Sequence, residues 1–169
     1  GLDELPLSGY FSAGIHPWYI SGTEASEVNR VLFPLIREAR CLAVGECGLD
    51  KIRGDSPEIQ KVIFLEHIYL SESIKKPLII HAVKSSDEIV QIYSNSKPIM
   101  PWIIHGFNNQ GRMALQYLKN GFYLSLGPSF FKRADAAEIC RLIPNDRFFL
   151  ETDDSKTDIE SIYRLASAC

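Results

Sequence analysis

Short apolar runs alternate with longer amphipathic segments along the 169 residues of this chain. The runs are apolar at nearly every position, which is typical of strands buried on both faces in a parallel sheet rather than of half-exposed strands. We therefore predict six strands, at YFSAGI (10–15), CLAVGE (41–46), PLIIHA (77–82), WIIHGF (102–107), FYLSLG (122–127) and RFFLET (147–152).

The segments between these runs have the apolar spacing of helices. Residues 24–39 and 57–75 are the longest, and we expect Thr23 and Ser56 to cap their N-termini because a hydroxyl can accept a free backbone N–H there. Shorter helices are predicted at 86–94, 111–119 and 134–142, and one more after residue 155. In the second long helix the repeating apolar positions are Ile59, Val62, Ile63 and Ile74.

Six strand–helix repeats predict an α/β fold with a parallel sheet. A complete (β/α)₈ barrel has eight repeats and usually needs at least about 200 residues. The sheet is therefore open, or it forms a short barrel, or part of a barrel is missing from this chain. We expect one domain over residues 1–169.

Polar side chains stand where the apolar runs end, and three of the four histidines are among them. Chemistry in parallel α/β folds is concentrated at the carboxyl ends of the strands. The fourth histidine, His67, lies inside the helix predicted at 57–75 and is expected to be structural. The residues at the strand ends are His16, Glu46, Asp50, His81, His105, Ser125, Glu151, Asp153 and Asp154.

Imidazoles and carboxylates that converge on one edge of a sheet form a site for a divalent cation such as Mg²⁺, Mn²⁺ or Zn²⁺. Such an ion lowers the pKa of a water and polarises a phosphoryl or carbonyl oxygen, so the pattern favours metal-assisted hydrolysis. The alternative for each histidine is a buried structural ring, and the alternative for the acidic turn at 151–154 is a solvated helix N-terminus.

The motifs that surround these residues resemble those of the TatD-type metal-dependent deoxyribonucleases, a family of amidohydrolase-like TIM-barrel hydrolases. They occur in the order typical of that family between residues 13 and 155. The matching motifs are AGIHPW (13–18), AVGECGLD (43–50), KPLIIHAV (76–83), IIHGF (103–107), GFYLSLG (121–127) and LETDDS (150–155).

The resemblance implies a TIM-barrel-like (β/α) parallel barrel, incomplete or distorted at its first and last strands, that holds one or two divalent ions. It implies that Glu46, His81, His105 and Asp153 are metal ligands, and that Glu46 and Asp153 are catalytic. Asp153 would bind metal and orient or deprotonate the attacking water. His16 would lie near the substrate phosphate.

The chain departs from the family pattern at its beginning. The family starts with an H-x-H pair on its first strand, and this sequence contains no H-x-H. Because the first residue is Gly1 rather than Met, we expect truncation rather than true loss of that strand. The segment after LETDDS is also shorter than is usual in the family.

Charge and cysteine content narrow the class of protein further. A net charge of −3 argues against coating nucleic acid by bulk electrostatics, but it allows an enzyme that contacts a few phosphates in a cleft. Arg53 and Lys84 follow strand ends and are our candidate phosphate contacts. The four cysteines form no C-x-x-C pair and are expected to be reduced thiols of a cytoplasmic protein.

These observations predict a hydrolase that acts on DNA or another phosphodiester, with no membrane segment and no obligate protein partner evident. Two alternatives remain open. The same metal site could hydrolyse small amides, lactones or phosphoesters. The absence of H-x-H could instead mark a metal-deficient, non-catalytic relative that serves as a binding module.

Overall fold

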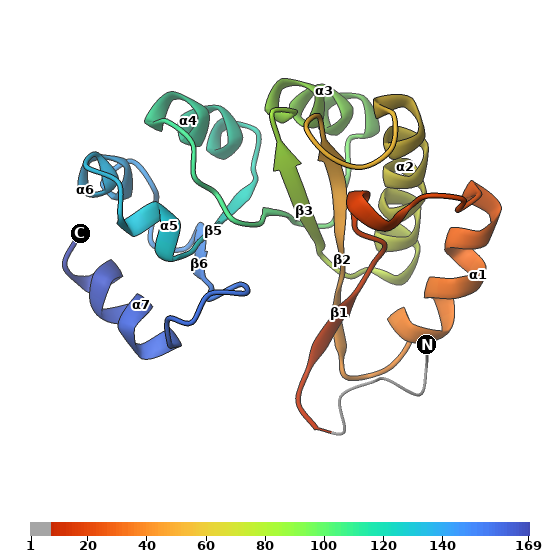
Figure 1. The fold of residues 1–169 in the computed structure, drawn as a ribbon, viewed down its shortest axis with the longest axis horizontal. Coiled ribbons are helices and arrows are strands. Elements are labelled where there is room, and N and C mark those ends of the chain that lie inside the picture. Colours follow the sequence, from red (N-terminus) through yellow and green to blue (C-terminus); the bar gives the residue numbers. More distant parts are fainter. Residues whose placement is uncertain (1–7) are drawn as a thin grey trace. The chain divides into compact units, whose positions relative to one another are not determined.

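The computed structural model describes residues 8–169, and the chain divides between Trp102 and Ile103 into two compact units (Figure 1). The segment 1–7, which contains no H-x-H pair, lies outside the described residues. Each unit is a run of strands and helices with its own core, and each is treated by itself below.

The first unit contains three parallel strands in chain order, with β1 paired to β2 and β2 to β3. Helices α1 and α2 pack against each other and against β2 (Figure 1). The elements are β1 (Phe11–Ala13), the 3-10 turn η2 (Pro17–Tyr19), α1 (Ala25–Ile36), β2 (Cys41–Asp50), α2 (Pro57–Ile74), β3 (Leu78–Val83) and α3 (Ser86–Ser96).

The second unit repeats this plan with shorter elements. Strand β5 pairs in parallel with β4 on one side and with β6 on the other. Helix α4 packs on β5 and α7 packs on β6. The elements are β4 (Trp102–Ile104), α4 (Gly111–Lys119), β5 (Tyr123–Leu126), α5 (Pro128–Phe131), α6 (Ala136–Cys140), β6 (Phe148–Leu150) and α7 (Ile159–Ser167).

The six predicted strands all form and are parallel, which confirms the predicted (β/α) fold class. Four of the strands, β1, β4, β5 and β6, are shorter than the runs that predicted them and contain three or four residues each. Strand β2 is longer than predicted and extends through Glu46 to Asp50.

Two local predictions for the helices were wrong. Helix α1 begins after Glu24 rather than Thr23, and Glu24 makes no side-chain capping bond. Helix α2 begins after Ser56 as expected, but it turns Ile59 and Val62 outward, with 44% and 48% of these residues exposed. The buried face of α2 is instead formed by Gln60, Ile63, Phe64, His67, Ile68, Leu70 and Ser71. The spacing of apolar residues alone could not predict which face of α2 is buried. The buried face includes three polar residues whose hydrogen bonds form only in the folded chain.

An irregularity in β2 positions the residues of interest. Val44 pairs with Leu78 and Cys47 with Ile80, so β2 contains one more residue than β3 over this interval. Such a bulge re-aims the side chains beside it. Glu46 lies in the bulge, and its neighbour Cys47 is buried.

Beyond the bulge the backbones of β2 and β3 come very close together. A Cβ atom added to Gly48 would lie 2.2 Å from the carbonyl oxygen of His81. Gly48 also has a φ of +134°, which an L side chain rarely adopts. Glycine is therefore required here for β2 to stay paired beside His81.

His67 is buried in α2 and ties this helix to the segment that follows β1. Its Nε2 accepts a hydrogen bond from the Ile15 backbone N–H at 2.9 Å, and its Nδ1 lies 2.8 Å from the Ile63 carbonyl oxygen. Burial lowers the pKa of His67 to about 4, so the ring is neutral near pH 7. The expectation that His67 is structural is confirmed, and its bond to Ile15 fixes the backbone beside His16.

The lowered pKa of His67 predicts a loss of stability in acid. The unfolded chain takes up this proton near pH 6.5 and the folded chain only near pH 4. The free energy of unfolding should therefore fall by up to about 3 kcal/mol as pH drops through this window. Urea unfolding of wild type and His67→Gln measures this, and their difference in stability should narrow between about pH 7 and pH 4. A difference that stays constant with pH would contradict this role.

The close approach at Gly48 predicts that Gly48→Ala destabilises the fold by about 3 kcal/mol. The alanine would have to adopt a strained φ, and β2 or β3 would have to move to make room for its Cβ atom. Gly22→Ala is the matched control, since Gly22 also has a positive φ of +75° but has no atom within 4 Å of an added Cβ. It should lose only about 1 kcal/mol. Equal losses in urea unfolding would show that contact with His81 is unimportant.

Candidate metal and substrate site

Three of the predicted site residues meet in the first unit. Glu46 comes from the bulge of β2, His81 from β3, and His16 from the turn after β1. One potential ligand atom from each of the three lies within 4.8 Å of the others. The rings of His16 and His81 are 4.4 Å apart, and His16 Nε2 lies 3.8 Å from Glu46 Oε2. A cleft of about 510 Å³ opens beside His16 and Glu46.

The hydrogen bonds of His16 determine which ring nitrogen carries its proton. The backbone N–H of Trp18 donates to His16 Nδ1 at 3.2 Å, so a neutral ring must carry its hydrogen on Nε2. That N–H faces Glu46. This arrangement suits a hydrogen-bond donor better than a metal ligand, and the contact of His16 with substrate stays a prediction.

Asp50 is a buried carboxylate, with 2% of its side chain exposed, and it organises the rest of this cluster. Its Oδ2 lies 2.7 Å from Trp18 Nε1 and 3.0 Å from His81 Nε2. Its Oδ1 accepts hydrogen bonds from the backbone N–H groups of Ile52 and Arg53. The Asp50 side chain thus holds an indole, an imidazole and two backbone N–H groups in fixed positions.

The charge on Asp50 is stabilised by these contacts. Burial alone would raise its pKa, but hydrogen bonds from an imidazole, an indole and two backbone amides outweigh burial and hold the pKa below its ordinary value. Asp50 is therefore ionised near neutral pH and acts only as an acceptor.

The predicted cationic contacts have different surroundings. The Arg53 guanidinium lies 3.8 Å from the centre of the Trp18 ring, which in turn makes edge contacts with His16 and His81. The stack holds a positive charge on the rim of the cluster while leaving its N–H groups exposed. Lys84 is exposed directly after β3, and its role in substrate binding stays a prediction.

The second unit brings together the other two predicted ligands. His105 follows β4 and Asp153 follows β6, and His105 Nε2 lies 3.6 Å from Asp153 Oδ2. Asp153 has a φ of +49°, a left-handed conformation that aspartate tolerates better than most residues. The Asp153 side chain is 54% exposed, so it is accessible to a ligand.

Glu151 supports His105 from the side opposite Asp153. Its Oε2 lies 2.9 Å from His105 Nδ1, and its Oε1 accepts the backbone N–H of Gly106 at 2.8 Å. Glu151 and Asp153 also line a cleft of about 210 Å³ between the segments that follow β4, β5 and β6. The carboxylates that follow β6 therefore open onto one cavity.

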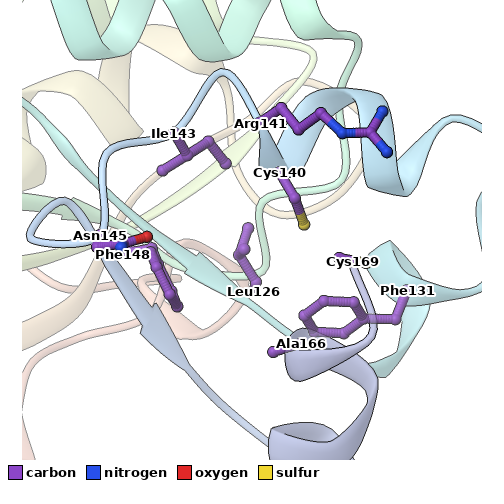
Figure 2. Close-up of a pocket in the computed structure, with 9 residues that line it drawn as sticks. All are labelled: Leu126, Phe131, Cys140, Arg141, Ile143, Asn145, Phe148, Ala166 and Cys169. Carbon is purple, nitrogen blue, oxygen red and sulfur yellow. The ribbon is translucent and has the colours of Figure 1, made fainter.

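A separate cavity of about 240 Å³ in the second unit is mainly apolar (Figure 2). Its lining includes no imidazole and no carboxylate side chain, so it does not have the groups for the predicted hydrolysis. Figure 2 shows Cys140 at this cavity. Burial and a hydrogen bond with Cys169 raise the pKa of Cys140 to about 12, which makes it a poor nucleophile near neutral pH.

Sequence reasoning placed Asp50 and Glu151 at strand ends but assigned neither of them a role, and it did not single out Trp18. The available signal was that each carboxylate stands in the same strand-end motif as a predicted ligand. Which carboxylate faces metal and which faces a histidine depends on side-chain direction, which spacing does not reveal.

The donor set fits a divalent cation of the kind that the resemblance implies. Imidazole nitrogens and carboxylate oxygens are ordinary ligands of Zn²⁺ and Mn²⁺, and carboxylates suit Mg²⁺. In the first unit the candidate atoms are already within 4.8 Å of one another.

The four cysteines lie in the part of the chain that the structure describes, and all of them are unbridged thiols. None of the helices in residues 8–169 is long and apolar enough to cross a bilayer.

Comparisons with known proteins agree with this geometry. An "Uncharacterized metal-dependent hydrolase" of Buchnera aphidicola subsp. Baizongia pistaciae is 35% identical over 84% of this chain and 54% of its own length. A "Putative deoxyribonuclease TATDN1 homolog" of Vairimorpha ceranae is 28% identical over 90% of this chain and 55% of its own length. The chain thus spans about half the length of these curated relatives.

A solved structure shows the same fold. The TatD homolog YJJV from Escherichia coli K12 superposes with a TM-score of 0.77 at 21% identity, covering 97% of this chain and 69% of that one. The family model of the TatD related DNases matches residues 2–159. This match covers nearly the whole chain and confirms the resemblance seen in its motifs: the chain belongs to the TatD related DNase family.

Proposed function

We propose that this protein is a metal-dependent hydrolase that cleaves phosphodiester bonds of DNA. The observation that carries the proposal is the cluster of His16, Glu46 and His81, in which polar atoms of two proposed metal ligands and of one proposed phosphate contact lie within 4.8 Å of one another. Family membership and relatives named as metal-dependent hydrolases and as a putative deoxyribonuclease support it.

The proposed metal ligands are Glu46 and His81 in the first unit and His105 and Asp153 in the second. One or two ions of Mg²⁺, Mn²⁺ or Zn²⁺ suit these donors. When bound, such an ion would lower the pKa of a water and withdraw charge from a phosphoryl oxygen. The remaining steps belong to side chains of the protein.

Asp153 is the proposed general base. Its carboxylate is exposed to the cleft and lies 3.6 Å from His105 Nε2, so it can accept a proton from water that attacks the phosphorus. Glu46 is 32% exposed beside the larger cleft of the first unit, where its carboxylate can orient a water. We assign the catalytic role to these two carboxylates.

His16 and Arg53 are proposed to bind the substrate. The Nε2–H of His16 points into the cluster and can donate to a phosphoryl oxygen. Arg53 offers a planar guanidinium, held over Trp18, that matches the geometry of a phosphate. Both groups favour an anionic phosphodiester over a neutral amide or lactone. Lys84 adds a flexible positive charge after β3.

The substrate partner in this proposal is DNA, and the location is the cytoplasm. Unbridged thiols at all four cysteines agree with a reducing compartment. The acidic net charge of −3 confines DNA contacts to the cleft rather than to a broad surface.

Asp153→Asn should reduce the rate of DNA cleavage by about 10²–10⁴-fold, because the amide cannot take a proton from water. Cleavage of a labelled single-stranded oligonucleotide with added Mn²⁺ or Mg²⁺ measures the rate. Asp146→Asn, the same substitution at an exposed turn, is the control and should cleave at the wild-type rate. If both variants match wild type, the activity does not arise from Asp153.

Removal of divalent ions should abolish hydrolysis, and adding Mg²⁺, Mn²⁺ or Zn²⁺ back should restore it. The measurement is the same oligonucleotide assay after dialysis against a chelator, with metal content determined in parallel. Full cleavage of the oligonucleotide by protein from which metal has been removed would contradict the proposal. Restored cleavage of a small phosphoester, but not of DNA, would assign the site to small substrates.

A further inference from the structure

Two histidines proposed as metal ligands are each held by a carboxylate that is not itself among the proposed ligands. Asp50 contacts His81 in the first unit, and Glu151 contacts His105 in the second. The two contacts involve opposite ring nitrogens: Asp50 faces Nε2 of His81, at 3.0 Å, whereas Glu151 faces Nδ1 of His105, at 2.9 Å.

A carboxylate has no hydrogen to donate, so a ring nitrogen within hydrogen-bond distance of it must carry one. The 3.6 Å between His105 Nε2 and Asp153 Oδ2 is too long for such a bond, so of these two carboxylates only Glu151 makes this contact with His105. A neutral imidazole carries a single hydrogen, and only the other nitrogen keeps a lone pair that can bind a cation. The contact with the carboxylate therefore selects the nitrogen that is available to a metal.

We propose that Asp50 and Glu151 are positioning residues that fix the tautomers of the two histidines, so that Nδ1 of His81 and Nε2 of His105 are the nitrogens available to a metal. This inference rests on the proposed function, because it assigns His81 and His105 as ligands. It adds two residues that do not touch the metal and a specific ligand atom for each histidine.

The surroundings of Asp50 explain why an aspartate is needed at this position. Its Oδ1 accepts two backbone N–H groups, and its Oδ2 faces the indole N–H of Trp18 as well as His81. An asparagine would have to turn its NH₂ group toward one of these sets of donors. The orientation that keeps both backbone bonds would point NH₂ at His81 Nε2 and favour the wrong tautomer.

The same reasoning applies to Glu151 with less force. A glutamine that keeps the bond from the Gly106 N–H would turn its NH₂ group toward His105 Nδ1. Rotating the amide would restore the tautomer and lose only that one backbone bond. We therefore expect Glu151→Gln to have a smaller effect than Asp50→Asn.

The direct test is nitrogen-15 NMR of the histidine rings in metal-free protein, at about pH 8.5 where ordinary histidines are neutral. Wild type should show His81 protonated at Nε2 and His105 at Nδ1, with signals assigned from His81→Asn and His105→Asn. Asp50→Asn should move the His81 proton to Nδ1. Trp18→Phe removes an N–H donor but keeps the carboxylate, so it should leave His81 protonated at Nε2.

Metal affinity supplies a second readout. Titration with Mn²⁺ or Zn²⁺, followed by calorimetry, should show roughly 10- to 100-fold weaker binding for Asp50→Asn and a smaller loss for Glu151→Gln. Asp146→Asn makes the same change of charge at an exposed turn and should bind as wild type does. Well-dispersed spectra of each variant establish that it is folded. If Asp50→Asn does not fold, Glu151→Gln still tests in the second unit whether the carboxylate fixes the histidine tautomer.

The outcomes separate this inference from the proposed function. Wild-type protein with His81 protonated at Nδ1, or Asp50→Asn with unchanged tautomer and metal affinity, would overturn the inference even if the protein cleaves DNA. The predicted tautomers together with the predicted losses of metal affinity would support it even if no DNA is cleaved, and in that case only the proposed function would fail.

Discussion

The parallel pairing of β2 with β3 is the constraint on which the first unit depends. The bulge between Val44 and Cys47 and the close backbone contact at Gly48 set the register in which Glu46, Asp50 and His81 meet. A one-residue shift would turn these side chains toward the opposite face of the sheet. His67 adds a second constraint from α2, because its bond to Ile15 holds the turn that carries His16.

The carboxylates of the site fall into two groups that differ in burial. Asp50 and Glu151 have 2% and 14% of their side chains exposed and are engaged by fixed N–H groups. Glu46 and Asp153 are more exposed, at 32% and 54%, and face clefts. Burial keeps the first pair rigid, and exposure leaves the second pair accessible to a cation and to water. In our proposal the two buried carboxylates orient the histidines, and the two exposed ones take part in the reaction.

Much of the fold could be predicted from the sequence, since continuous apolar runs and helical spacing give strand and helix identity directly. The face of α2 could not, because Gln60 and His67 are buried only through bonds to distant backbone atoms. The candidate site residues could be selected from their place at strand ends and from family motifs. Their proposed division into ligands and supports could not, because Glu46 and Asp50 are close neighbours on β2, and the sequence does not show which of their side chains is buried against a histidine.

The central claim is that a divalent ion binds to histidine nitrogens selected by neighbouring carboxylates. A crystal structure of the protein soaked with Mn²⁺ or Zn²⁺, with the ion located by anomalous scattering, tests it most directly. The account predicts anomalous density bonded to Nδ1 of His81, with Nε2 still donating to Asp50. Density on Nε2 of His81, or a fully occupied ion at a site that excludes His81 and His105, would contradict it.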